Sequence, residues 1–223
     1  FEAIVSNPPY SIRWDGDANP LLINDPRFAP AGVLAPKSKA DLAFTLHILS
    51  WLAVNGTAAI VEFPGVLYRG GAEQKIRRYL IDNNYVDAVI QLPPDLFFGT
   101  TIATCIIVLK KSKHDNATLF IDASAEFVRS GNKNKLTDAQ QRKILDAFVA
   151  RRNIDHFARL VDNGNIAENG FNIAVSSYVE QQDTRETVDI RALNAEIARI
   201  VARQAELRTA IDAIVADLEG KQA

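Results

Sequence analysis

Four consecutive residues near the start of the chain, Asn7-Pro8-Pro9-Tyr10, have the types needed to act on a weakly nucleophilic amine. The side-chain oxygen of Asn7 accepts hydrogen bonds, and the backbone carbonyl of Pro8 is a second acceptor beside it. Together they could bind both hydrogens of an exocyclic amine and hold its nitrogen closer to tetrahedral geometry. Pro8 and Pro9 stiffen the loop, so the acceptors are in place before a substrate arrives. Tyr10 offers an aromatic face on which a base could stack.

The alternative for this loop is a proline-rich turn that Asn7 caps. The loop directly follows residues 1–6, an apolar segment that favours a strand. Two consecutive prolines end such a strand, because they fit neither a helix nor a ladder of hydrogen bonds. Residues 11–37 then form a long polar loop with four prolines, and a loop of this length in a compact domain is usually functional or mobile.

Helices and strands alternate after this loop. Apolar residues at helical spacing predict helices from Lys39 to Ala53 and, after Gly70-Gly71, from Ala72 to Asn83. Short apolar runs predict strands over residues 57–63, 85–91, 102–109 and 118–122. This order predicts an α/β fold with a largely parallel sheet covered on both faces. Segment 92–101 is too short for a helical crossover, so the strands on either side of it should be antiparallel neighbours, which ends the sheet in an antiparallel strand.

The remainder of the chain is mainly helical. A charged helix is expected over residues 137–152, a loop-rich part over 161–187, and one long helix from about Val188 to Glu219. The long helix carries a heptad seam about four heptads long, on the order of 40 Å of helix. The seam consists of Ile190, Leu193, Ile197, Ile200, Gln204, Leu207, Ile211, Ile214 and Leu218.

Two uses of this seam are open. It could pack inside a bundle of this chain, or it could bind another chain, which we favour because little of the sequence remains to cover it. Gln204 within the seam would fix the register at some cost in stability. The residues expected at a subunit interface are Leu193, Ile197, Ile200, Gln204, Leu207, Ile211 and Ile214.

Composition leaves the function open but excludes a membrane protein of the helical type. The chain of 223 residues is 48% hydrophobic and 23% charged, with a net charge of −2, and no apolar run approaches the roughly 20 residues that span a bilayer. A small negative total neither indicates nor excludes nucleic-acid binding, because a basic patch can coexist with it. The single cysteine, Cys105, lies in an apolar run and should be buried and inert. No signal peptide is recognised at residue 1, and a cytoplasmic protein is expected.

The sequence resembles a known family over almost all of residues 1–122. Asn-Pro-Pro-Tyr at a strand end is the catalytic motif of amino-methyltransferases, and the chain is similar to the methylation subunits of type I restriction-modification systems. The likeness is carried by residues 7–10, 37–44, 56–81 and 89–111, and the tract from Leu92 to Lys111 is especially specific. It implies that this chain is the carboxy-terminal two-thirds or so of such a subunit. The chain would then contain the carboxy-terminal half of a Rossmann-like methyltransferase sheet, with an antiparallel edge strand, plus a C-terminal helical extension.

The resemblance also implies an activity and partners. The expected reaction is transfer of a methyl group from S-adenosylmethionine to N6 of a flipped-out adenine in duplex DNA. A specificity subunit would choose the target, a second methylation subunit would flank it, and a restriction subunit could join. In this scheme residues 1–125 belong to the catalytic domain, 126–187 form a helical and loop-rich connection, and 188–223 form the helix for subunit assembly.

By this resemblance Asn7, Pro8, Pro9 and Tyr10 form the catalytic loop, and Phe97, with Phe98 as the second choice, stacks on the flipped base. Two core phenylalanines at a strand edge are the alternative. Asp41 opens a helix and is expected to cap it. Arg69, Lys75, Arg77 and Arg78 lie around a helix start where phosphate contact is plausible, although a solvated helix face fits them equally well.

The site for the cofactor is the part that the sequence leaves unassigned. The family carries a glycine-rich loop ahead of its Asn-Pro-Pro-Tyr motif, so that loop is expected upstream of Phe1, and Gly70-Gly71 does not replace it. The chain alone should therefore bind S-adenosylmethionine poorly, and no metal site is expected.

Two other functions compete with DNA methylation. The same motif serves methyltransferases that act on protein glutamine or on RNA bases, because those amines pose the same chemical problem. The tract from Leu92 to Lys111 and the long C-terminal helix argue against them. A non-catalytic assembly module is the third hypothesis, but a scaffold has no need for an intact loop from Asn7 to Tyr10.

Overall fold

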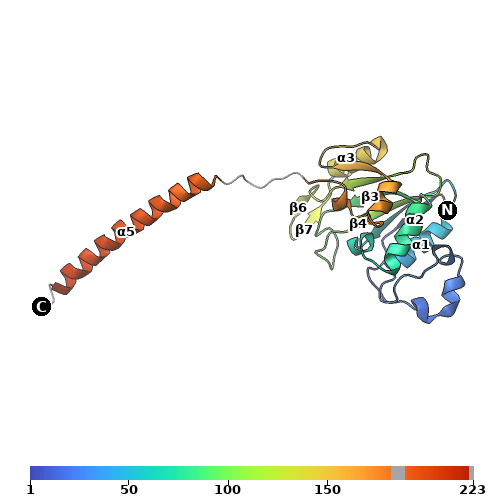
Figure 1. Cartoon of the computed structure of the whole chain (residues 1–223), viewed down its shortest axis with the longest axis horizontal. Coiled ribbons are helices and arrows are strands. Elements are labelled where there is room, and N and C mark those ends of the chain that lie inside the picture. Colours follow the sequence, from blue (N-terminus) through green and yellow to red (C-terminus); the bar gives the residue numbers. More distant parts are fainter. Residues whose placement is uncertain (182–188, 221–223) are drawn as a thin grey trace. The chain divides into compact units, whose positions relative to one another are not determined.

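The structure is a computed structural model that describes residues 1–181 and 189–220 (Figure 1). The chain divides into two compact units, Phe1–Gln182 and Asp183–Ala223. The sequence grouped residues 126–187 as a connection separate from 1–125, whereas the described part of this segment lies within the first unit. The reason is that its helix and its strand pack on the central sheet. None of the described helices is long and apolar enough to cross a membrane.

A six-stranded sheet forms the centre of the first unit, in the order β1-β2-β4-β3-β5-β8. The strands are β1 (Ala3–Ser6), β2 (Thr57–Glu62), β3 (Val86–Gln91), β4 (Cys105–Lys110), β5 (Ala117–Asp122) and β8 (Ala158–Asp162). β1 is parallel to β2, β3 is parallel to β5, and β4 is antiparallel to both β2 and β3. Strands β1, β2, β3 and β5 therefore run in one direction, and their carboxyl ends meet at one edge of the sheet.

The antiparallel strand after the 92–101 segment is confirmed, but its place differs from the expectation. β4 inserts between β2 and β3 instead of ending the sheet, and the antiparallel edge strand is β8. The difference has a physical cause. Cys105, Ile107, Leu109 and Val108 are all buried, so β4 needs cover on both faces and partners on both sides. Residues 158–162 were not predicted as a strand, because only Ala158 and Val161 are buried in this edge strand.

Successive residues of the inner strands serve two different cores. Cys105, Ile107 and Phe120 face a core that includes α1 (Asp41–Trp51), α2 (Ala72–Asp82) and Ile166 of α4 (Asn163–Glu168). Ile90, Val108 and Ile121 face the other core, which contains residues of α3 (Asp138–Ala150). Figure 1 shows α3 on the opposite side of the sheet from α1 and α2. The predicted sheet with helices on both faces is thus present.

Shorter elements occupy the stretches expected to be loops. The 11–37 segment forms the 3-10 turns η1 (Gly16–Ala18), η2 (Pro20–Asn24) and η3 (Ala29–Ala31), and it buries Phe28, Leu34 and Ala35. The turns η4 (Pro64–Leu67) and η5 (Val175–Ser177) follow β2 and α4. A two-stranded hairpin of β6 (Val128–Ser130) and β7 (Lys133–Lys135) was not predicted, because its strands are short and polar.

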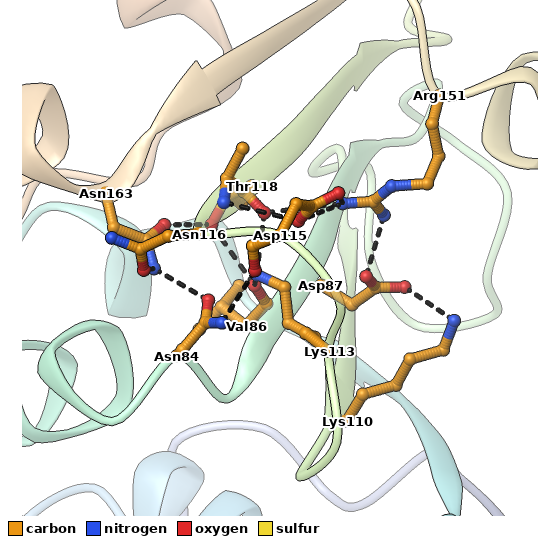
Figure 2. Close-up of polar contacts among 11 residues, drawn as sticks. Asn84, Val86, Asp87, Lys110, Lys113, Asp115, Asn116, Thr118, Arg151 and Asn163 are labelled. Atoms are coloured by element: carbon orange, nitrogen blue, oxygen red, sulfur yellow. Dashed lines mark hydrogen bonds and ion pairs between the residues drawn. The ribbon is translucent and has the colours of Figure 1, made fainter.

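A network of hydrogen bonds and ion pairs lies at the edge of the sheet where β3 and β5 begin (Figure 2). Arg151, just past α3, donates to Asp87 Oδ1 at 2.7 Å, and Lys110 Nζ lies 3.1 Å from Asp87 Oδ2. Lys113 Nζ donates to the carbonyls of Val86 and Ala117, and burial lowers the pKa of this lysine to about 8. This network joins α3, β3 and the turn between β4 and β5. It lies at the opposite end of the strands from the loop that contains Asn7, so it stabilises the fold without touching that loop.

The described residues of the second unit, 189–220, form one long helix, α5 (Ile190–Gly220). None of its 31 residues is buried. At about 1.5 Å per residue it is about 46 Å long. The helix predicted for this part of the chain is confirmed, and its apolar seam is exposed. Its predicted first residues, Val188 among them, fall partly outside the described residues.

A candidate active site at the carboxyl edge of the sheet

The carboxyl edge of the sheet gathers the segments that could act on a substrate. The loop from Asn7 to Tyr10 follows β1, η4 follows β2, and residues 92–104 connect β3 to β4. The segment after β5 leads to the β6–β7 hairpin. In open sheets of this kind, loops at the carboxyl ends of parallel strands carry the ligand-binding groups. The topology therefore brings together segments that lie up to about a hundred residues apart in sequence.

Within the first loop, Asn7 and Tyr10 are coupled directly. The Tyr10 hydroxyl donates a hydrogen bond to Asn7 Oδ1 at 2.8 Å. A carbonyl oxygen has two lone pairs, so Asn7 Oδ1 keeps one for a second donor. Asn7 is exposed, and Pro8 and Tyr10 are half-buried. The tyrosine thus orients the amide whose oxygen would receive the substrate, a role that the sequence did not indicate.

Asp41 fastens the far end of this loop. It is the first residue of α1 and is 1% exposed. Its Oδ1 accepts a hydrogen bond from the backbone N–H of Ser11 at 2.6 Å, and Ser11 adopts a left-handed backbone with φ of 51°. The backbone N–H of Ala40 also donates to the carbonyl of Ile12 at 2.9 Å. The expectation that Asp41 caps its own helix is therefore wrong. The N-cap residue is Ala40, no side-chain capping hydrogen bond is present, and the Asp41 carboxylate binds the residue that follows Tyr10.

A buried acid lies at the end of the neighbouring strand. Glu62, the last residue of β2, is fully buried and accepts a hydrogen bond from Thr45 Oγ1 at 2.9 Å. Burial, and to a lesser extent the nearby Asp41 carboxylate, raise its pKa to about 8. Desolvation, and to a lesser extent the charge of Glu62, raise the pKa of the Tyr10 hydroxyl. Tyr10 therefore stays protonated and remains a hydrogen-bond donor to Asn7.

Cys105 is buried, as expected. It is 0% exposed, and its thiol donates to the backbone carbonyl of Glu62 at 3.4 Å. Desolvation raises the pKa of the thiol, which opposes formation of a reactive thiolate.

The two phenylalanines after β3 have different environments. Phe97 is half-buried and packs against the core on the α3 side of the sheet, whereas Phe98 is 96% exposed. Phe98 therefore presents more of its ring to a substrate than Phe97 does, and stacking of either ring on a base stays a prediction. Strands β1 and β3 are three spacings apart in the sheet, about 14 Å. Tyr10 and Phe98 lie in the loops that follow these two strands at the same edge of the sheet.

The β6–β7 hairpin supports the loop that carries Phe98. Lys133 Nζ donates to the carbonyls of Phe97 and Thr100 at 2.9 and 3.1 Å. The side-chain amide of Asn134 donates to the carbonyl of Pro94 at 2.8 Å. Neither Lys133 nor Asn134 was predicted from the sequence as a site residue. Their only local signal is a short basic and polar stretch, Arg129 to Lys135, that contains Gly131.

The four basic residues proposed for phosphate contact differ in burial and in their partners. Arg77 is 1% exposed, and its guanidinium donates to the carbonyls of Phe171 and Val66 at 2.7 and 2.9 Å. Burial lowers its pKa to about 10, so it remains charged, and it stabilises the fold instead of binding a phosphate. The expectation for Arg77 is therefore wrong, because a helical pattern alone does not reveal that the residue faces carbonyls from distant segments.

Arg69, Lys75 and Arg78 remain on or near the surface. Arg69 lies 5.2 Å from the Phe63 ring centroid and 3.5 Å from Glu73, close to the carboxyl end of β2. Arg78 pairs with Asp82 in the last turn of α2, which leads away from this edge. Lys75 is exposed. Phosphate contact by Arg69 and Lys75 stays a prediction, while Arg78 is less suitably placed.

Comparison with known proteins decides the family. A model of the family described as N-6 DNA Methylase matches residues 1–187.

The chain belongs to the N-6 DNA methylase family.

Relatives and solved structures agree with this assignment. The chain is 50% identical, over 98% of its length, to the methylase subunit of the type I restriction enzyme MpnII from Mycoplasma pneumoniae. It matches the crystal structure of a type I restriction-modification methyltransferase subunit from Streptococcus thermophilus with a TM-score of 0.78 and 46% identity over 81% of the chain. The EcoKI M protein, at 18% identity and a TM-score of 0.62 over 92% of the chain, shares the fold. The resemblance to type I methylation subunits and the Rossmann-like methyltransferase fold are thereby confirmed.

The N-6 DNA methylase chain described here spans only part of these proteins. It covers 40% of the length of the MpnII subunit, 38% of the Streptococcus thermophilus subunit and 48% of the EcoKI M protein. This share is smaller than the two-thirds expected from the sequence.

Proposed function

We propose that this chain supplies the acceptor-binding half of a methyltransferase that modifies N6 of adenine in duplex DNA. The observation that carries the proposal is the loop at the carboxyl end of β1. There Asn7 is exposed, and its acceptor oxygen is oriented by the hydroxyl of Tyr10. Membership of the N-6 DNA methylase family supports the same reaction.

The chain's own residues account for activation of the amine. Asn7 Oδ1 and the carbonyl of Pro8 accept hydrogen bonds from the two N6 hydrogens of adenine, which localises the lone pair on nitrogen. The nitrogen then forms a bond to the methyl carbon while the bond between that carbon and the donor's sulfur breaks, and N6 releases one of its protons to solvent. Tyr10 and Phe98 provide aromatic faces on either side of a base that has left the duplex. Because this arrangement stabilises the transition state by fixed acceptors, no side chain needs to remove a proton before the transfer.

S-adenosylmethionine is the proposed donor, and when bound it supplies an electrophilic methyl group on sulfur. The free edge of β1 is the proposed place for the segment that would bind this donor. β1 pairs with β2 on one side only among the described residues, and Val5 is 86% exposed. The glycine-rich loop expected ahead of Phe1 would belong beside this edge. No residue of the described chain is assigned to the cofactor.

Assembly is proposed to involve α5. Its exposed seam suits a coiled coil with another chain, and the specificity subunit is the proposed partner. The second methylation subunit and the restriction subunit would complete the complex. This part of the proposal rests on the likeness to methylase subunits of type I restriction enzymes.

Two alternatives predict different products. A methyltransferase for protein glutamine or RNA would use the same acceptors on a different amine. An assembly module would bind its partners without any transfer. The family assignment favours DNA over the first alternative, and the coupled pair of Asn7 and Tyr10 argues against the second.

The test is methyl transfer from labelled S-adenosylmethionine to duplex DNA by the full-length subunit with its specificity partner. The product is digested to nucleosides and identified. We expect label in N6-methyladenine, a loss of at least about 100-fold in Asn7→Ala, and a smaller loss in Asn7→Asp, which keeps an acceptor oxygen. Partner binding should be unchanged in both variants.

Other outcomes point to the alternatives. Label in protein or RNA would support the second activity. No label with the wild-type complex intact would support the assembly module. If Asn7→Ala retained full activity, the assigned mechanism would be wrong.

A further inference from the structure

The loop between β3 and β4 presents an apolar ring to solvent. Phe98 is 96% exposed, whereas its neighbour Phe97 packs against the core. A single exposed phenylalanine is common and needs no explanation by itself. This one is unusual because the loop around it is held by hydrogen bonds from a separate element.

Five hydrogen bonds connect the β6–β7 hairpin to residues 94–100. Two come from Lys133 Nζ, to the carbonyls of Phe97 and Thr100. Two come from Asn134, whose side-chain amide donates to Pro94 and whose backbone N–H donates to the carbonyl of Asp95. The fifth joins the Arg129 guanidinium to the Asp95 carboxylate at 3.1 Å.

The position of Lys133 explains how the ring is displayed. Its ammonium group bridges the carbonyls of residues 97 and 100, which closes the turn around Gly99, whose φ is +76°. Phe98 and Gly99 then project from the closed turn. Without this bridge the turn would gain conformational freedom, and the ring could fold back on the surface.

Asn134 holds the base of the same loop. It is 6% exposed, and its Oδ1 also accepts from Arg129 at 3.1 Å. A polar side chain so deeply buried is costly unless all its hydrogen bonds are made, and here they all serve the loop or the hairpin.

We propose that Lys133 and Asn134 are positioning residues that hold Phe98 against the target base during methylation. The inference deepens the function proposed above and rests on it. It assigns a role to the β6–β7 hairpin, and it selects Phe98 as the aromatic residue opposite Tyr10.

The experiment compares two lysines of the same strand in the full-length subunit with its specificity partner. Lys133→Met removes both hydrogen bonds to the loop, while Lys135→Met removes an equal charge from an exposed position of β7. Hydrogen exchange of peptides covering residues 92–104 reports whether the loop is held. Methylation kinetics and the fluorescence of 2-aminopurine placed at the target adenine report whether the base is bound.

For Lys133→Met we expect faster exchange in the 92–104 loop and a fall in kcat/KM for DNA of about 10-fold or more. The KM for S-adenosylmethionine should not change, and the 2-aminopurine signal should decrease. Phe98→Ala should give the same loss without faster exchange. Lys133→Arg should restore activity in part, because a guanidinium can also donate to two carbonyls. Lys135→Met should behave as wild type in all three measurements.

Two results would overturn the proposal. One is an equal loss in Lys133→Met and Lys135→Met, which would show a general effect of charge. The other is unchanged exchange of the loop in Lys133→Met. If the wild-type complex made no N6-methyladenine, the proposed function would fail, while the exchange comparison would still decide whether Lys133 holds the loop.

Discussion

Glu62 lies in an environment that strongly disfavours its charged form. It is fully buried at the end of β2, where Thr45 Oγ1 donates a hydrogen bond to its Oε1. Its Oε2 has no hydrogen-bond partner among the described residues. With a pKa of about 8, this carboxyl is mostly protonated at neutral pH. The neutral form is the one that a buried site beside Asp41 tolerates, because a second charge there would be poorly solvated.

The raised pKa predicts how stability depends on pH. Between the ordinary pKa of 4.5 and the folded value of about 8, the folded state holds a proton on Glu62 that the unfolded state has released. The free energy of unfolding should therefore fall as pH rises through this range, by up to about 1.4 kcal/mol per pH unit from this residue. Glu62→Gln should remove this contribution, as measured by urea unfolding of the full-length subunit at pH 5.5 and 8.

A matched control is Glu168→Gln, at an exposed position of α4. It should leave the pH dependence unchanged. An unaltered slope in Glu62→Gln would mean that another group is responsible.

At the scale of elements, the proposed catalytic loop, residues 7–10, depends on α1 for its position. Asp41 at the start of α1 accepts the N–H of Ser11, and the backbone of Ala40 reaches Ile12. The loop is thereby attached to a helix whose inner face is packed against β2. A loop that contains Asn7 and Tyr10 needs such an anchor, because a misplacement of about 1 Å can cost about 100-fold in rate.

Asp41→Ala should lower kcat for methylation by about 10-fold or more, because Ser11 loses its acceptor and the loop is freed. The unpaired N–H should also cost about 1–3 kcal/mol of stability. Asp41→Asn should be milder, because the amide oxygen can still accept from Ser11. Methylation kinetics and thermal unfolding of the three proteins provide the comparison.

Ser11→Ala is the control for the side chain. Its hydroxyl lies 3.5 Å from Asp41 Oδ2, too far for a strong hydrogen bond, so the substitution should have little effect. Wild-type kcat in Asp41→Ala would show that the loop does not need this anchor.

At the scale of the whole molecule, the two units differ in whether they bury their own apolar side chains. The first has its own core on both faces of the sheet. The second, α5, exposes the apolar side chains of its seam, with Ile200 56% and Leu207 49% exposed. A helix of this kind normally gains its stability from packing against a partner.

Leu207→Glu should therefore abolish association with the specificity subunit, because a charge would be buried in the centre of the seam. The unfolding temperature of the first unit should not change. Ala202→Glu, on the face of α5 away from the seam, is the matched control and should assemble normally. Light scattering after gel filtration of the mixed subunits measures the association of both variants. Assembly of the Leu207→Glu variant with the specificity subunit would contradict a role for the seam.

Local patterns determined much of this protein. The heptad seam of α5, the strands from β1 to β5 and the helices between them follow from periodicity, which depends only on covalent neighbours. The loop of Asn7, Pro8, Pro9 and Tyr10 was recognisable for the same reason, since four adjacent residues carry its chemistry. The buried state of Cys105 also followed from the apolar run around it.

Tertiary structure alone decided the features that depend on distant partners. Arg77 donates a hydrogen bond to the carbonyl of Phe171, 94 positions away, and is therefore a buried structural residue. Lys133 meets Phe97 across 36 positions, and Asp41 meets Ser11 across 30. The place of β4 inside the sheet is of the same kind. Such pairings leave no periodic trace in the sequence, because the chain must fold before the two groups are neighbours.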